Sequence, residues 1–277
     1  MIRLISLHPQ VHGDAGFALP AGRSLSSGQR KLLSRARAAV VPQSIREAAW
    51  AECLALCPRI FPDYHCRFGW EGKRGNHRLF ASLGLPHPAT RSFASVAEFA
   101  RLHPPGAPLP LAFPLVVKAD QGGGGFCVFL VRNPDGFCAA LSALKAREAA
   151  GEPGFVVQEY VDHGGRDLRV VLVGKRMIPY WRVQDNPAEF RNNLGRGARI
   201  EPRGDPVLTA RGLDAAKALR QRSGINLAAV DILFRPGGDP LLSEVNFVFG
   251  RKGVGGTPRF RSILREEVEQ WIAGLSP

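Results

Sequence analysis

Short apolar runs alternate with amphipathic segments from one end of the chain to the other. Apolar runs of about four to eight residues bounded by glycine or proline are typical of strands, and apolar positions three and four residues apart indicate helices. Strands are therefore expected at 1–8, 38–41, 59–64, 115–120, 126–131, 155–161, 168–173, 176–183, 228–234 and 241–247. Helices are expected at 45–57, 73–84, 94–103, 134–149, 207–223 and 258–274.

The stretches between these elements divide the chain into modules. Residues 11–30 are rich in glycine and serine and are expected to form a loop, and the proline-rich residues 104–114 read as a linker. Ser44, followed three residues later by Glu47, predicts a capping box at the start of the helix over 45–57.

The order of the elements predicts a mixed α+β protein in three parts. We expect a short N-terminal α/β domain over 1–72 and two α+β subdomains over 73–161 and 162–277.

Composition narrows the class of protein. The chain has 277 residues, 45% hydrophobic and 22% charged, which is ordinary for a globular protein. No apolar run approaches the ~20 residues that a membrane helix needs, and the start has no signal-peptide pattern. We therefore expect a cytoplasmic protein without a membrane partner.

The net charge of +13 favours an acidic partner. An arginine-rich composition of 30 Arg and 7 Lys is equally typical of a GC-rich genome. Because the basic residues are dispersed and aromatic residues are few, nucleic acid is not the expected partner. The oligomeric state is left open.

The five cysteines do not predict a disulfide framework, because their number is odd. Cys53, Cys57, His65 and Cys66 lie close enough in sequence to form a zinc site. The apolar surroundings of Cys53 and Cys57 are equally typical of buried free thiols, and both interpretations stay open.

Acidic and amide side chains interrupt the two apolar strands at 228–234 and 241–247. Glu244 and Asn246 are two residues apart, so they share one strand face, and Asp231 lies on the expected hairpin partner. Oxygen ligands of this kind suit Mg²⁺. The alternative is that Asp231 is an ordinary strand acid and that Glu244 pairs with an arginine.

Two further segments suit the binding of phosphate. Gly122, Gly123, Gly124 and Gly125 lie between two strands, after Lys118, and glycine allows backbone N–H groups to approach phosphate oxygens closely. The loop over 189–202 carries a set of donors for phosphate and acyl oxygens, namely Arg191, Asn192, Asn193, Arg196 and Arg199. A flexible hairpin tip and a solvated basic loop are the structural alternatives.

Taken in order, these segments resemble the ATP-grasp superfamily, and specifically the RimK-like amino-acid ligases. The resemblance runs from about residue 73 to about residue 250 and is carried by PLVVKADQGGGG, VVQEYVDHGGRDLRVVLVGKR, FRNNLGRGARIEP, VDILF and SEVN. It implies an ATP-grasp fold, in which two α+β subdomains enclose the nucleotide.

The resemblance also implies roles for individual residues. Lys73, Lys118 and the four glycines would contact the phosphates of ATP, Glu159 and Tyr160 would hold adenine, and Asp167 would hold the ribose. Arg191 and Asn192 would reach the phosphates, and Arg191, Asn193 and Arg196 would be the catalytic residues. Asp231, Glu244 and Asn246 would hold Mg²⁺, with Mn²⁺ as the alternative ion.

The implied activity is an ATP-dependent carboxylate–amine ligase that forms an amide or peptide bond through an acylphosphate. Its substrates would be a carboxylate and an amine acceptor, with an acidic substrate favoured by the basic loops. The alternatives are a phosphotransferase on the same scaffold and a non-catalytic protein that binds a nucleotide or an acidic partner. The chain departs from the family pattern after Asn246, where Arg251 and Lys252 lie in a glycine-containing loop ahead of a helix and would suit an anion.

Overall fold

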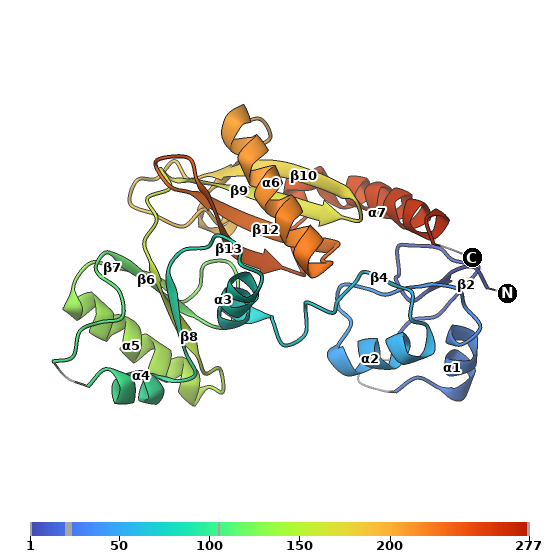
Figure 1. Ribbon diagram of the computed structural model, residues 1–277, viewed down its shortest axis with the longest axis horizontal. Coiled ribbons are helices and arrows are strands. Elements are labelled where there is room, and N and C mark those ends of the chain that lie inside the picture. The colour runs from blue at the N-terminus through green and yellow to red at the C-terminus, as the bar shows by residue number, and fades with distance from the viewer. Residues whose placement is uncertain (1, 20–23, 105, 276–277) are drawn as a thin grey trace.

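The computed structural model describes residues 2–19, 24–104 and 106–275. They form three β-sheets that follow one another along the chain, with helices packed against them (Figure 1). The mixed α+β class expected from the sequence is confirmed. Each sheet falls within one of the ranges 1–72, 73–161 and 162–277, whose status as separate domains stays a prediction.

The N-terminal sheet is parallel and has the strand order β2-β1-β3-β4. Its elements are β1 (Ile5–Ser6), β2 (Ala15–Gly16), α1 (Ser27–Leu33), β3 (Ala39–Val40), α2 (Glu47–Leu56) and β4 (Ile60–Phe61). The prediction of a loop over residues 11–30 is wrong, because β2 and the start of α1 lie within this range. Residues 20–23 of the range are outside the described residues. The cap expected at Ser44 is also wrong: α2 begins after Arg46, and no side chain caps it.

The middle sheet is antiparallel and has the strand order β5-β8-β6-β7. Its elements are α3 (Gly72–Ser82), β5 (Thr90–Phe93), α4 (Val96–Leu102), β6 (Leu115–Ala119), β7 (Val128–Val131), α5 (Pro134–Ala149) and β8 (Phe155–Glu159). Strand β7 starts two residues later than expected, because Cys127 has a φ of +51° and belongs to the turn.

The C-terminal sheet has the strand order β11-β10-β9-β12-β13, and all of its neighbouring strands are antiparallel. Its elements are β9 (Arg166–Val173), β10 (Arg176–Val183), β11 (Arg199–Glu201), α6 (Pro206–Ser223), β12 (Leu227–Phe234), β13 (Pro240–Asn246) and α7 (Gly256–Ala273), with short 3₁₀ turns at Leu194–Arg196 and Lys252–Val254. Strand β11 was not expected, since its residues read as a basic loop. Helices α6 and α7 cover opposite faces of this sheet (Figure 1).

Specific hydrogen bonds join the three sheets. The side-chain amide of Gln43 donates to the carbonyl of Phe247 (2.9 Å), which ties the N-terminal sheet to the segment after β13. The backbone N–H of Val245 donates to Asn76 Oδ1 (2.7 Å), which ties α3 to β13. Helix α3 also contacts β5 and β8, so it lies between the middle and C-terminal sheets. In the described part of the chain, no helix is both long enough and apolar enough to cross a membrane.

Candidate nucleotide and metal site

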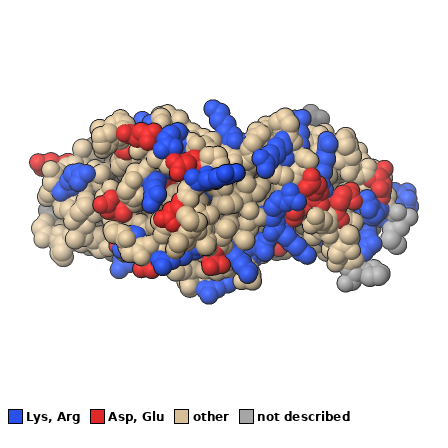
Figure 2. Space-filling view, turned by 90° about the horizontal axis from the view of Figure 1, so that it is seen from above, with Lys and Arg blue, Asp and Glu red and all other residues tan. Residues whose placement is uncertain are grey.

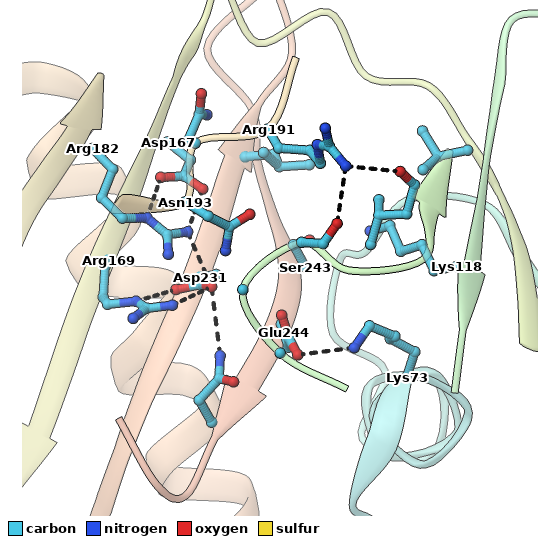
Figure 3. A pocket seen from close by; sticks show the side chains of 18 of the residues that line it. Lys73, Lys118, Asp167, Arg169, Arg182, Arg191, Asn193, Asp231, Ser243 and Glu244 are labelled. Atoms are coloured by element: carbon cyan, nitrogen blue, oxygen red, sulfur yellow. Dashed lines mark hydrogen bonds and ion pairs between the residues drawn. The ribbon is translucent and has the colours of Figure 1, made fainter. Parts of the chain in front are cut away.

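A cavity of about 480 Å³ lies between the middle and C-terminal sheets. Strands β6 and β8 and the glycine loop (Gly122–Gly125) form one wall, and strands β9, β10, β12 and β13 form the other. Figure 3 shows charged side chains from both walls pointing into the space between them. The predicted site residues that line the cavity are Lys73, Lys118, the four glycines, Glu159, Tyr160, Asp167, Arg191, Asn192, Asn193, Asp231, Glu244 and Asn246.

Two lysines enter this cavity from different elements. Lys73 is the second residue of α3, and its ammonium donates to the carbonyl of Gly122 (2.8 Å) and lies 3.5 Å from Glu244 Oε1. Lys118, on β6, donates to Gln158 Oε1 (2.7 Å). Burial lowers the pKa of Lys118 to about 8, although Glu244 opposes the shift. The structure thus brings together two lysines that are separated by 45 residues in sequence.

Two physical reasons favour glycine in the glycine loop: positive φ angles and close packing. Gly122, Gly124 and Gly125 have positive φ angles of 116°, 67° and 76°, a region that other residues rarely adopt. A Cβ on Gly125 would also lie 2.8 Å from Asn193 Oδ1, whereas a Cβ on Gly123 would meet nothing within 4 Å. The loop can therefore pack closely against the loop that carries Asn193.

Arg191 and Arg196 hold the glycine loop from the opposite wall. The guanidinium of Arg191 pairs with Glu189 (2.6 Å) and donates to the carbonyl of Gly125 (3.0 Å). The guanidinium of Arg196 lies over the ring of Phe126, 5.2 Å from its centre. Arg196 does not line the described cavity, and its contact is with Phe126, directly after the glycine loop.

Asp231 is surrounded by arginine side chains. Arg169, opposite Asp231 in the β9–β12 pair, donates two hydrogen bonds to it (2.6 and 2.7 Å), and Arg182 lies 3.0 Å from Oδ2. Burial alone would raise the pKa of Asp231, but these two guanidinium groups outweigh it and hold the pKa below its ordinary value. Arg182 also donates to Asp167 (2.8 Å). Two buried acids are thus balanced by the buried Arg182 and the partly buried Arg169.

The hairpin that carries the three predicted metal ligands is present. Asp231 lies opposite Glu244, with a bulge directly after Asp231, and the Nδ2 of Asn246 is 3.5 Å from Asp231 Oδ2. The side chain of Glu244 is 32% exposed, and its ion-pair partner in the described residues is Lys73, not an arginine. The oxygens of Glu244 and Asn246 therefore fit a magnesium ion, while Asp231 already has arginine partners.

The residues expected to bind adenine and ribose are also tied to protein partners. Glu159 accepts a hydrogen bond from the N–H of Ala89 (3.0 Å) and pairs with Arg235 (2.5 Å). Asp167 is 6% exposed and pairs with Arg182. The structure places both at the cavity wall, with their carboxylates already engaged.

Sequence reasoning missed Arg169, Arg182 and His163, which line the same cavity. A basic residue inside an otherwise apolar strand, as in DLRVV and YWRV, is the signal that could have found the two arginines. A long cation is rarely buried in such a strand without an acid opposite it.

The cysteines do not form a metal site in the described residues. No group of three or more His, Cys, Asp or Glu side chains there is placed to hold a metal ion. Cys53 and Cys57 are buried, and burial raises the pKa of the Cys53 thiol to about 12. Their surroundings suit buried neutral thiols.

Comparison with solved structures defines the class of the fold. The chain superimposes on the crystal structure of a RimK domain ATP-grasp protein from Sphaerobacter thermophilus with a TM-score of 0.60 and 19% identity, over 98% of this chain and 99% of that one. A D-cycloserine synthetase gives a TM-score of 0.59 and 16% identity, over 97% and 99% of the two chains. At these identities the likeness shows the fold alone.

The sequence places the chain within that class. Residues 74–258 match the model of the RimK-like ATP-grasp domain, so the chain belongs to the RimK-like ATP-grasp family. It is 34% identical over 143 residues to a probable alpha-L-glutamate ligase of Halorhodospira halophila. The aligned region covers 51% of this chain and 44% of that protein. A relative of the same name in Pseudomonas fluorescens is 35% identical over 165 residues, covering 57% and 50%. The chain thus spans about half the length of these curated relatives.

Proposed function

We propose that this protein is an ATP- and magnesium-dependent carboxylate–amine ligase that forms an amide or peptide bond through an acylphosphate. One observation carries the proposal: a single cavity has two lysines and a glycine loop on one wall, and Glu244 and Asn246 on the other. Cations and backbone N–H groups suit phosphate oxygens, and side-chain oxygens suit magnesium. Membership of the RimK-like ATP-grasp family supports the same conclusion.

Different residues of the cavity would bind the phosphates and the magnesium ion. Lys73, Lys118 and the glycine loop would hold phosphate oxygens, and Glu244 with Asn246 would hold magnesium. Magnesium, when bound, would neutralise phosphate charge. Asp231 would join this ligand set only by exchanging a hydrogen bond from Arg169 or Arg182.

Arg191 is the residue best placed to stabilise developing negative charge, because it reaches the glycine loop from the opposite wall. Asn193 lies beside it, against Gly125. Arg196 would act through Phe126 as a positioning residue, not as a catalytic one. Tyr160 would offer backbone groups to adenine at the end of β8, and Asp167 would orient the ribose side of the cavity.

An acidic substrate is the second part of the proposal. The curated relatives are named as glutamate ligases. Arg251 and Lys252 follow the cavity-lining residues Val248, Phe249 and Gly250, and neither pairs with a described acid. Figure 2 shows Lys and Arg scattered among Asp and Glu on the face in view, which suits a local anion site better than a nucleic-acid track.

The decisive experiment measures ADP release and product mass together. The full chain is incubated with ATP, Mg²⁺, L-glutamate and a peptide amine, and each component is omitted in turn. A ligase releases ADP in a sustained way only when both the carboxylate and the amine are present, and it yields a product heavier by one residue. ADP release with one substrate alone would identify a phosphotransferase, and salt-sensitive RNA binding without ADP release would identify a non-catalytic binder.

A further inference from the structure

A second cavity, of about 850 Å³, lies at the N-terminal sheet, outside the residues that match the family model. Its walls include the residues that directly follow β1 (Leu7, His8 and Pro9) and those that follow β3 (Pro42 and Ser44–Arg46). In the sheet order β2-β1-β3-β4, the chain leaves β1 toward one edge and β3 toward the other. Open parallel sheets bind ligands in the crevice where two such connections diverge, beyond the carboxyl ends of the strands.

The start of helix α2 lines this cavity and has unused hydrogen-bond donors. Its N-cap, Arg46, makes no side-chain capping bond, so the first-turn N–H groups of Glu47, Ala48 and Ala49 have neither a side-chain cap nor an intrahelical acceptor. Ala48 and Ala49 line the cavity. The exposed guanidinium of Arg46 makes no ion pair with a described acid. The end of the cavity at α2 therefore offers backbone donors and the guanidinium of Arg46, beside the carboxylate of Glu47 in the first turn.

His8 is a second and independent indication of a ligand. Its side chain is 7% exposed, lines the cavity, and accepts a hydrogen bond at Nδ1 from the N–H of Gln10 (3.1 Å). Burial, together with the charge of Arg251, lowers the pKa of His8 to about 4, so the ring is neutral at pH 7. The proton then sits on Nε2, which has no hydrogen-bond partner among the described residues. A donor at the cavity wall without a protein acceptor is available to an oxygen atom of a ligand.

The remaining lining favours an apolar body on that ligand. Leu7, Phe17, Leu19 and Ile45 supply much of the wall. Glu52, the acidic residue in this lining, pairs with Arg30 (2.6 Å) and accepts from the N–H of Leu25 (3.3 Å), so its charge is already balanced.

One hydrogen bond ties the rim of the second cavity to the segment that leads to the first. Gln43 lies between the lining residues Pro42 and Ser44, and its side chain donates to the carbonyl of Phe247. Phe249 and Gly250, just beyond, line the nucleotide cavity.

We propose that the second cavity binds an organic acid with an apolar body, its carboxylate accepting hydrogen bonds from His8, Arg46 and the first turn of α2. In the ligase this acid would be one of the two co-substrates, and that role, unlike the binding itself, rests on the proposed function.

The test measures binding without ATP, by calorimetry on the full chain at pH 7. The probes are N-acetyl-L-leucine and its uncharged amide, N-acetyl-L-leucinamide. We expect the acid to bind about tenfold or more tightly than the amide, because the charge-assisted bonds exist only for the acid. Arg46→Ala should remove this preference, whereas Arg101→Ala, an exposed change on α4, should leave it intact. No saturable binding of the acid, equal affinity for both probes, or an unchanged Arg46→Ala variant would overturn the proposal.

A ligation assay separates this proposal from the proposed function. Arg46→Ala should raise the KM of one co-substrate about tenfold while leaving the KM of ATP unchanged. Binding of the acid without any ATP-dependent ligation would refute the ligase and leave the site standing. Ligation by a protein that does not bind the acid would refute the site and leave the ligase standing.

Discussion

Arg169 and Asp231 face each other on neighbouring strands and are joined by two hydrogen bonds, Nε to Oδ1 at 2.6 Å and Nη2 to Oδ2 at 2.7 Å. Asp231 is 5% exposed and the side chain of Arg169 is 14% exposed, so this pair is largely buried. Glu244, directly opposite Asp231 on the other side, is partly exposed, and its ion-pair partner among the described residues is Lys73, at 3.5 Å. Asp231 and Glu244, both predicted to bind magnesium, therefore have different electrostatic surroundings.

The first prediction concerns the buried pair. Asp231→Asn removes the buried counter-charge of Arg169, while Arg182 keeps Asp167 as its partner, so the free energy of unfolding should fall by about 3–5 kcal/mol. Urea denaturation followed by circular dichroism measures the change. A loss no larger than that of a typical surface substitution would show that solvent reaches the pair.

The second prediction is the matched change on the opposite strand. Glu244→Gln should alter the free energy of unfolding by less than about 0.5 kcal/mol, because the side chain is partly exposed and only weakly paired. It should, however, remove the effect of Mg²⁺ on ATP binding, measured by calorimetry with and without the ion. ATP turnover at the wild-type rate in this variant would mean that Glu244 is not a magnesium ligand.

The third prediction is a pH dependence that originates at Lys118. Its pKa in the folded protein is lowered from 10.5 to about 8, so the ammonium charge is lost as pH rises through 8. ATP affinity should therefore decrease between about pH 7 and 9, and Lys118→Arg should flatten this dependence because arginine stays charged. Persistence of the full pH dependence in the arginine variant would assign it to another group.

The same pKa has a consequence for stability. Below pH 8 the folded protein carries a buried ammonium at Lys118 that is better solvated in the unfolded chain, and this destabilisation is relieved as pH rises from about 8 toward 10.5. Lys118→Met should therefore be more stable than the wild type at pH 7, and this advantage should shrink toward pH 10.5.

The fourth prediction separates two glycines of one loop. Gly125→Ala places a Cβ 2.8 Å from Asn193 Oδ1 at a φ of +76°, so it should displace the loop and reduce kcat/KM for ATP about tenfold or more. Gly123→Ala, where a Cβ meets nothing within 4 Å, is the control and should stay within about twofold of the wild type. Equal effects of the two changes would show that loop flexibility matters and that close packing does not.

The fifth prediction tests whether Arg196 acts through Phe126. Their contact at 5.2 Å is a cation–π interaction worth about 0.5–1 kcal/mol at an exposed site, so each of Arg196→Gln and Phe126→Leu should raise the KM of ATP about two- to fivefold. The double variant should be no worse than either single one. Additive effects, or a loss of kcat in Arg196→Gln alone, would restore Arg196 as a catalytic residue.

Much of the fold could be predicted, because most elements have a local pattern. Strands β12 and β13 were expected as an apolar hairpin, and the structure has them antiparallel with Asp231 opposite Glu244. Strand β2 was missed because Ala15 and Gly16 lie in a glycine-containing segment, whereas the equally short β1, β3 and β4 lie in apolar runs. The start of β7 was misplaced because the positive φ of Cys127 has no signature in an otherwise apolar run.

The sequence by itself pointed to residues that line the cavity: Lys118 before the glycines, and Glu244 and Asn246 on one face of a strand. These features depend on neighbours in the chain, through the two-residue period of a strand and the freedom of glycine at positive φ. Only the tertiary structure decided that Asp231 pairs with Arg169, 62 residues earlier, and that Arg196 contacts Phe126. The physical reason is that strand order and register bring distant residues face to face, and a charge buried at such a contact takes its partner from the opposite strand.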